Sequence, residues 1–428
     1  MLFLNLCCPP VHPRSLAMRI VNWFMDGNKK MSTRYTACTD RASVVFCLIA
    51  SLALSCKSLW AQSPSFPDVT RNCPSCDLRQ ARLFGAELAG ADLRGAYLYW
   101  ANLKRADMRN AQLDSADLRG ALMHEARLDS ASLVEADLRR ALLLDANLAD
   151  ANLRGARLDS ADMRRMRARR AHLLGAALRA VFLQGADLTG AVLVQADLSG
   201  ADLREALLDS ADLREARLQD AHLRGASLRA VDLRRAILQR ARLDKADLRG
   251  AILVGADLID AHLRGVDLSG ANVERAVLRL ADLGHAKVVG AQLLTADLRK
   301  AQLDSADLRG SSFTGANLWR ANMRGSILVG AGLARTRLER ADLLRADLRN
   351  AELQMANMRD VSLRHARLDS ADLRKAVLVG ADMRGAFFKG ADLREADIAN
   401  TNLQNAVLTG AVWVDGRVCG KGSVGGCK

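Results

Sequence analysis

A period of five residues runs through most of this chain and constrains its fold more than any other feature. An apolar residue, usually Leu, recurs at every fifth position from Leu78 to Trp413 without an insertion, and a small residue, usually Ala, precedes each by two positions. On an α-helix, these residues would circle the axis and leave no apolar stripe. On a flat strand, an odd period would turn every second Leu toward water. The period therefore argues against both a helical bundle and a flat sheet.

The geometry that suits this period turns the chain through a corner every five residues. Each Leu then returns to the same interior, successive coils stack at about 4.8 Å, and backbone groups pair between coils. Ala suits the second inward position because the interior of a narrow coil has little room. The sequence therefore predicts an all-β solenoid, although Ala, Leu and Arg are good helix formers.

Units such as Ala91-Asp92-Leu93-Arg94-Gly95 resemble the pentapeptide-repeat family, whose unit reads A-(D/N)-L-x-x. The resemblance covers residues 76–413 and implies a right-handed quadrilateral β-helix with four units per coil. That architecture would give about 17 coils and a rod of roughly 80 Å at strand spacing. We assign the β-helix to residues 76–415, a linker or N-terminal cap to residues 62–75, and a Gly-rich C-terminal cap to residues 416–428.

An export signal is predicted within the N-terminal leader, residues 1–61. Residues 42–56 form an uncharged apolar stretch preceded by basic residues, as in the signal-peptide helix of a secreted protein. The stretch is shorter than the ~18–20 residues of a transmembrane helix. Cleavage after Ser55 or Ala61 would place the protein in the periplasm or outside the cell. Two alternatives stay open, in which an uncleaved leader or a lipidated Cys56 anchors the protein to the membrane.

Four cysteines remain once the leader is removed, and they stand in two local pairs. Cys73 and Cys76 precede the repeats, and Cys419 and Cys427 follow them. In an exported chain, this placement favours one structural disulfide near each end. A redox CxxC is an alternative for the first pair, although no βαβ pattern surrounds it. A zinc site shared by both pairs would require the two ends of the chain to meet.

Two places in the repeat depart from its usual composition. Tyr97, Tyr99 and Trp100 occupy outward positions of one unit, where they form a candidate interaction patch or a cover for the first coils. The other place is a basic spot in which Met and Ala have exchanged their inward positions. A volume-conserving core swap explains this exchange, and contact with a polyanion is the alternative. The basic spot consists of Arg164, Arg165, Arg167, Arg169 and Arg170.

The sequence predicts no catalytic, cofactor-binding or metal-binding site. Leu-Asp-Ser-Ala recurs on all four faces of the expected coil, which is typical of a repeat rather than of one active site. His222 and His262 occupy equivalent positions two coils apart, too far to share a metal ion. A G-x-G-x-x-G match at 420–425 lies too close to the end of the sequence for a helix to follow it. The chain is therefore predicted not to be an enzyme.

Charge separates two functional hypotheses. Family members that inhibit or protect DNA gyrase imitate DNA, which requires a strongly acidic rod. This chain has a formal net charge of +14, and its acidic and basic residues are interleaved. The interleaving also argues against specific binding of nucleic acid. We therefore expect an exported structural or protein-interaction scaffold of the bacterial envelope, with a protein partner that the sequence does not identify. The alternative is a cytosolic modulator of DNA gyrase.

Overall fold

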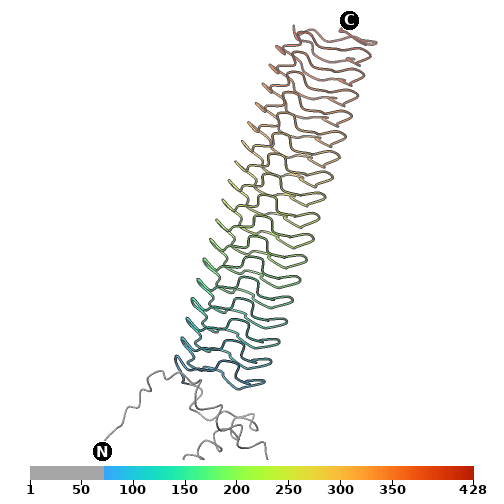
Figure 1. Cartoon of the computed structure of the whole chain (residues 1–428). Coiled ribbons are helices and arrows are strands. Elements are labelled where there is room, and N and C mark those ends of the chain that lie inside the picture. The colour runs from blue at the N-terminus through green and yellow to red at the C-terminus, as the bar shows by residue number, and fades with distance from the viewer. Residues whose placement is uncertain (1–71) are drawn as a thin grey trace, which may run out of the picture. The chain divides into compact units, whose positions relative to one another are not determined.

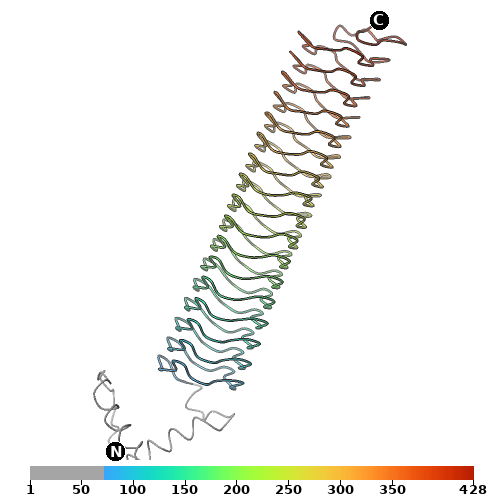
Figure 2. The same cartoon turned by 45° about the vertical axis from the view of Figure 1, so that its right-hand side comes forward.

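The computed structural model describes residues 72–428, which form one continuous stack of coils (Figure 1). Two views of the stack show no inserted loop between its coils (Figures 1 and 2). Each unit contributes a single bridging residue, at every fifth position from Asn72 to Val412. From Asn72 to Asp392, each pairs in parallel with the residue one coil further on, as Asn72 does with Asp92. Four units therefore complete one coil, and the fold is a quadrilateral β-helix.

The core is a narrow column filled by the two inward residues of every unit. The central residue of a unit, such as Leu118, and the residue two places before it, such as Ala116, are both fully buried. Phe313 and Phe388 replace the central Leu without becoming exposed. Burial of this apolar surface stabilises the coils by roughly 25 cal/mol for each Å² removed from water. The inward positions agree with the five-residue pattern of the sequence.

Backbone hydrogen bonds between coils follow one rule in the interior of the stack. In the unit centred on Leu103, Asn102 N–H donates to the carbonyl of Ala81 in the preceding coil, and Leu103 N–H donates to the carbonyl of Leu122 in the following coil. A third bond to the following coil and one turn bond use two further N–H groups. The N–H of the residue after the central one, here Lys104, is the one that the backbone leaves without a partner.

The turn between units places its last residue in the left-handed region of backbone space. Trp100 has a φ of 57° there, and Gly120 takes the equivalent place in the next coil with a φ of 63°. A residue with a side chain incurs a steric cost at this position that glycine does not. The corners of the rod are therefore formed by the two residues that follow each central residue.

The bridging pattern begins one unit earlier than the sequence suggested. Residues 62–75 were expected to form a linker or cap, but Asn72 already bridges to the next coil and Cys73 takes the place of a central Leu against the core. The repeat of Leu at every fifth position does not include Cys73, although its small apolar side chain suits the same inward position. The predicted leader, residues 1–61, lies outside the residues that the structure describes.

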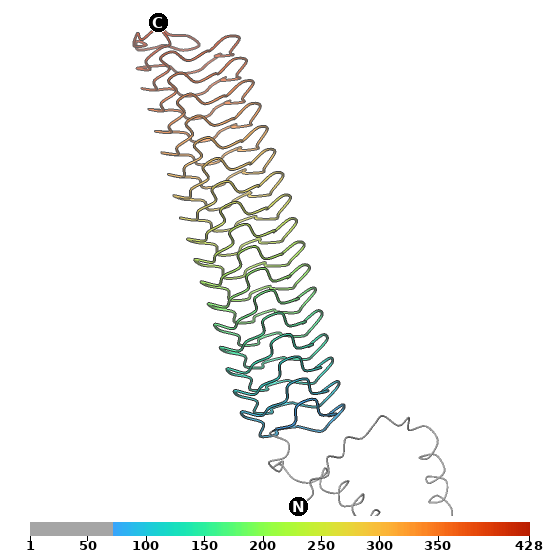
Figure 3. The ribbon, with the colours of Figure 1, turned by 90° about the vertical axis from the view of Figure 1, so that its left-hand side faces the viewer.

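At the other end, the Gly-rich tail folds back over the last coil (Figure 3). Val418 and Val424 form antiparallel bridges to residues of that coil. The N–H groups of Leu408 and Gly410, which have no further coil to bind, donate to carbonyl groups of the tail. The tail therefore takes the place of a following coil along this part of the edge, and an exposed edge of this kind would otherwise invite association.

Candidate functional site

In many units, an outward side chain satisfies the one N–H group that the backbone leaves unpaired. Asp117 Oδ1 accepts this bond from the Arg119 N–H, and the Arg119 guanidinium donates to both oxygens of the same carboxylate. These bonds lower the pKa of Asp117, so the pair stays charged in mild acid. Every Asp-Leu-Arg and Asp-Met-Arg unit of residues 72–428 forms the same pair. Many arginines are therefore already occupied within their own unit.

Two of the Leu-Asp-Ser-Ala copies, those of Asp114 and Asp209, satisfy the same backbone group in the following coil. Asp114 accepts hydrogen bonds from the Ser132 hydroxyl and the Val134 N–H of the following coil. Asp209 accepts an equivalent pair of bonds one coil ahead of it. Neither aspartate is placed to activate a serine of its own unit by these contacts. The two copies therefore have a structural role.

Four of the five arginines in the basic spot are engaged by aspartates. The ion pairs are Arg164–Asp162, Arg165–Asp145, Arg169–Asp187 and Arg170–Asp150. Three of these four aspartates belong to the coil before or after the arginine. The local sequence around the basic spot therefore does not show that its positive charge is neutralised. Beneath the spot, Met166 and Ala168 are both 1% exposed, and the exchange of large and small residues is accommodated inside the coil.

The aromatic unit lies within the paired stack rather than across its end. Tyr97 bridges to Asp77 on one side and to Asp117 on the other. Tyr97 and Trp100 are about half exposed, at 51% and 49%, and Tyr99 is 36% exposed. These rings therefore stand on the side of the rod, where a partner could contact them.

Tyr99 and Trp100 form one wall of a groove. The groove lies on the Leu78 corner, which consists of the two residues after each central residue on the face that contains Leu78. An added Cβ at Gly120 would come within 2.9 Å of the Trp100 indole, so the ring covers this glycine closely. The Arg119 guanidinium lies 5.2 Å from the centroid of the Tyr99 ring, a cation–π distance. We call this site the Tyr99 groove.

The charges around the Tyr99 groove largely cancel. Arg119 and Arg139 are each held by the aspartate of their own unit. Asp159 also lines the groove, together with Arg140, and adds a carboxylate to its wall. The groove therefore offers aromatic surface with little net charge.

The Leu78 corner contains a second groove, which was not predicted from the sequence. It runs over four consecutive coils and is lined by Ile259, Arg279, Leu280, Arg299, Lys300 and Trp319. Three of these residues are cations and none is an acid. Because they recur at intervals of about one coil, a comparison of residues 20 positions apart would have revealed the row. We call this site the Trp319 groove.

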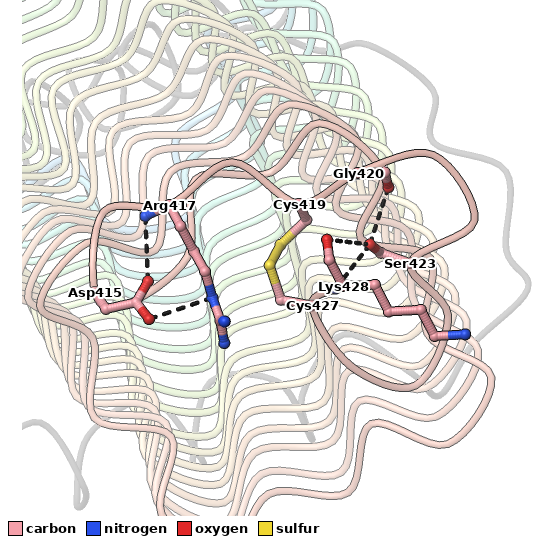
Figure 4. Close-up of a disulfide and its surroundings, with 7 residues drawn as sticks. All are labelled: Asp415, Arg417, Cys419, Gly420, Ser423, Cys427 and Lys428. Carbon is pink, nitrogen blue, oxygen red and sulfur yellow. Dashed lines mark hydrogen bonds and ion pairs between the residues drawn. A yellow bond between two sulfur atoms is a disulfide. The ribbon is translucent and has the colours of Figure 1, made fainter.

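The structure joins Cys73 to Cys76 and Cys419 to Cys427 by disulfides. The first disulfide closes the turn of the first described unit, with the two Cα atoms 5.5 Å apart. The second links two parts of the tail, and Cys419 is buried against the last coil (Figure 4). Figure 4 also shows the Ser423 hydroxyl donating to the Gly420 carbonyl, which holds the tail in a closed loop.

Residues 72–428 contain no group of His, Cys, Asp and Glu side chains close enough together to hold a metal ion. Over the same residues, no helix combines the length and the apolar character that crossing a bilayer requires. The outward side chains form ion pairs and shallow grooves, an arrangement suited to binding.

A family profile described as pentapeptide repeats matches overlapping segments between residues 72 and 410. Among solved structures, the chain is similar to HetL, a pentapeptide repeat protein involved in heterocyst differentiation regulation from the cyanobacterium Nostoc. The two sequences are 30% identical, the match covers 56% of this chain and 92% of HetL, and the TM-score is 0.27. Rfr23, a pentapeptide repeat protein from the cyanobacterium Cyanothece, is 37% identical over 22% of this chain and 62% of its own, with a TM-score of 0.20. QnrB1, a plasmid-mediated fluoroquinolone resistance protein, is 20% identical over 43% of this chain and 90% of its own, with a TM-score of 0.23. No curated protein matches the sequence.

Proposed function

The chain belongs to the pentapeptide repeat family, and we propose that it is a non-enzymatic, exported rod that serves as a structural or protein-interaction scaffold of the bacterial envelope. The observation that carries the proposal is the state of its cysteines. All four cysteines of the described residues are paired, one pair at each end of the coil stack. Disulfides persist in oxidising compartments and are rare in the cytosol. The apolar stretch at residues 42–56 supports the same compartment.

A scaffold role is supported by the surface of the rod. Ion pairs and backbone N–H groups occupy the aspartates of the Asp-Leu-Arg units, and two grooves on one corner expose aromatic or apolar residues. Such residues are enriched at protein interfaces. The matching family profile describes a repeat rather than an enzyme domain. The proposed activity is therefore binding of another protein along the side of the rod.

The experiment that tests export is the intact mass of the natively expressed protein, measured with and without reduction in separated cell fractions. We expect an extracytoplasmic chain that has lost about 55–61 residues, as cleavage at a signal peptidase site requires. Reduction should add the mass of four hydrogen atoms, two for each disulfide. A full-length cytosolic chain with free thiols would reject export. Only that result would justify a gyrase supercoiling assay for the alternative function.

A further inference from the structure

We propose that the Trp319 groove binds an acidic peptide segment of a partner protein, running parallel to the rod axis. The proposal specifies a partner for the scaffold function, on which it rests for its biological meaning. Lys300 Nζ lies 5.7 Å from the centroid of the Trp319 ring, and the Arg320 guanidinium carbon lies 5.2 Å from it. Two cations therefore flank one indole, where both can contact an incoming anion.

These two cations differ from most basic residues of the rod. Neither Lys300 nor Arg320 has a carboxylate within ion-pair distance among residues 72–428, whereas Arg299 is held at 2.6 Å by Asp297. Arg279 lies 3.8 Å from the same aspartate. One carboxylate thus serves two arginines, and the groove retains an excess of positive charge. This excess selects a ligand that carries carboxylates.

The groove also contains apolar surface that a purely ionic ligand would leave uncovered. Leu280 is 52% exposed at the corner of its coil, and Ile259 lies beside it in the lining. The Trp319 groove has a volume of about 340 Å³, at the lower end of the range for ligand sites. A peptide with alternating acidic and apolar side chains would satisfy both the cations and Leu280.

The length and the ends of the groove limit what can occupy it. Three coil steps separate Ile259 from Trp319, which at strand spacing is about 14 Å, the span of roughly four extended residues. Asp260 stands beside Ile259 in the sequence, and Glu339 follows Trp319 one coil later on the same corner. Arg337 holds Glu339 at 3.4 Å, so Glu339 ends the row of cations without adding a free charge. The exposed Asp260 would repel a long polyanion that ran past Ile259. A short acidic segment would fit between Asp260 and Glu339.

The test is fluorescence anisotropy of a labelled hexapeptide of alternating Glu and Leu, blocked at both ends and titrated with the full chain at low salt. We expect saturable binding that weakens as salt is added. Lys300→Gln and Arg320→Gln should each weaken binding about 3- to 5-fold, the size of one exposed ion pair. Leu280→Ser should weaken it about 3- to 10-fold through lost apolar contact. All three side chains point outward, so thermal melting should show that the variants remain folded.

Arg140→Gln provides the matched control, because Arg140 is an exposed cation on the same corner in the Tyr99 groove. It should leave binding unchanged, and a Lys-Leu peptide should not bind. Equal losses for Arg140→Gln and Lys300→Gln would overturn the proposal by showing non-specific attraction. Binding to anionic phospholipid vesicles through Lys300, without binding to the peptide, would also overturn it in favour of a membrane surface. Because the assay uses purified protein, its failure leaves the export proposal standing, and failure of export leaves this result standing.

Discussion

The basic spot and the Trp319 groove show that positive charge along the sequence and positive charge in space are different properties of this protein. The basic spot holds five arginines between residues 164 and 170, the densest basic run in the repeat, yet aspartates engage four of them. The Trp319 groove draws its cations from two successive coils, and Lys300 has no carboxylate partner among residues 72–428. The basic spot, which is rich in arginine along the sequence, is therefore nearly neutral in the structure. The Trp319 groove, which no run of basic residues marks in the sequence, is cationic.

The difference follows from the distance along the chain at which side chains meet. Arg165 contacts Asp145, 20 residues before it, and Arg169 contacts Asp187, 18 residues after it. In a coil of four units, a side chain has outward neighbours within its own unit and also about one coil away in both directions. The net charge of a surface region can therefore be judged only when residues 2, 18 and 20 positions away are considered together.

The largest expected effect concerns the core beneath the basic spot and asks whether packing explains its unusual sequence. Met166→Ala should destabilise the protein by about 2–5 kcal/mol through the cavity that it leaves. Ala168→Leu should destabilise it by about 1–3 kcal/mol through overpacking. The double variant restores the usual pattern of the repeat and should recover most of the loss. Denaturant unfolding would measure the three variants, and simple additivity of the two losses would contradict a coupled core swap.

A second prediction is that the basic spot binds a polyanion once the aspartates that engage its arginines are removed. Asp145→Asn with Asp150→Asn removes the partners of Arg165 and Arg170. We expect affinity for a heparin oligosaccharide to rise about tenfold, since each exposed charge contact contributes up to ~1 kcal/mol. The matched control is Asp267→Asn with Asp304→Asn, which changes the net charge equally, away from the basic spot and from the Trp319 groove. An equal gain in the control would mean that net charge alone governs binding.

A third prediction concerns the Tyr99 groove and tests how closely Trp100 packs over Gly120. Gly120→Ala would push a Cβ to 2.9 Å from the Trp100 indole, whereas Gly175→Ala has a similar φ and no atom within 4 Å. Both variants incur the cost of a left-handed alanine, about 1–2 kcal/mol. Gly120→Ala should be less stable by about 1 kcal/mol more, because the aromatic contact is displaced. Equal melting temperatures would show that Trp100 packs only loosely over the corner.

The smallest expected effect is the acid dependence of the ion pairs in the basic spot. Hydrogen bonds from Arg165 and Arg170 lower the pKa values of Asp145 and Asp150 below the usual value for aspartate. A lowered folded-state pKa means that the stabilisation is complete above about pH 4 and is lost as the pH falls through the lowered values. The melting temperature should therefore exceed that of the double Asp→Asn variant equally from pH 5 to pH 8. This difference in melting temperature should disappear in stronger acid. Its disappearance near pH 6 would contradict the lowered pKa values of Asp145 and Asp150.

The sequence predicted the architecture well because the inward positions obey a strictly local rule. Leu118 and Ala116 face the core for the same reason as their counterparts in every other unit, and one period therefore identifies them all. The same reasoning missed the first unit, where Cys73 stands in place of Leu. It identified Tyr99 and Trp100 because they are neighbours in one unit. It missed Trp319 because the other walls of that groove come from earlier coils.

The sequence by itself determined the solenoid, the inward residues and the placement of the cysteines at both ends, because burial in a narrow coil tests each five-residue unit separately. Only the tertiary structure decided which outward charges are cancelled and which are left to bind. Those charges interact across coils, about 20 residues apart, and the strength of an ionic contact depends on distance in space rather than on separation along the chain.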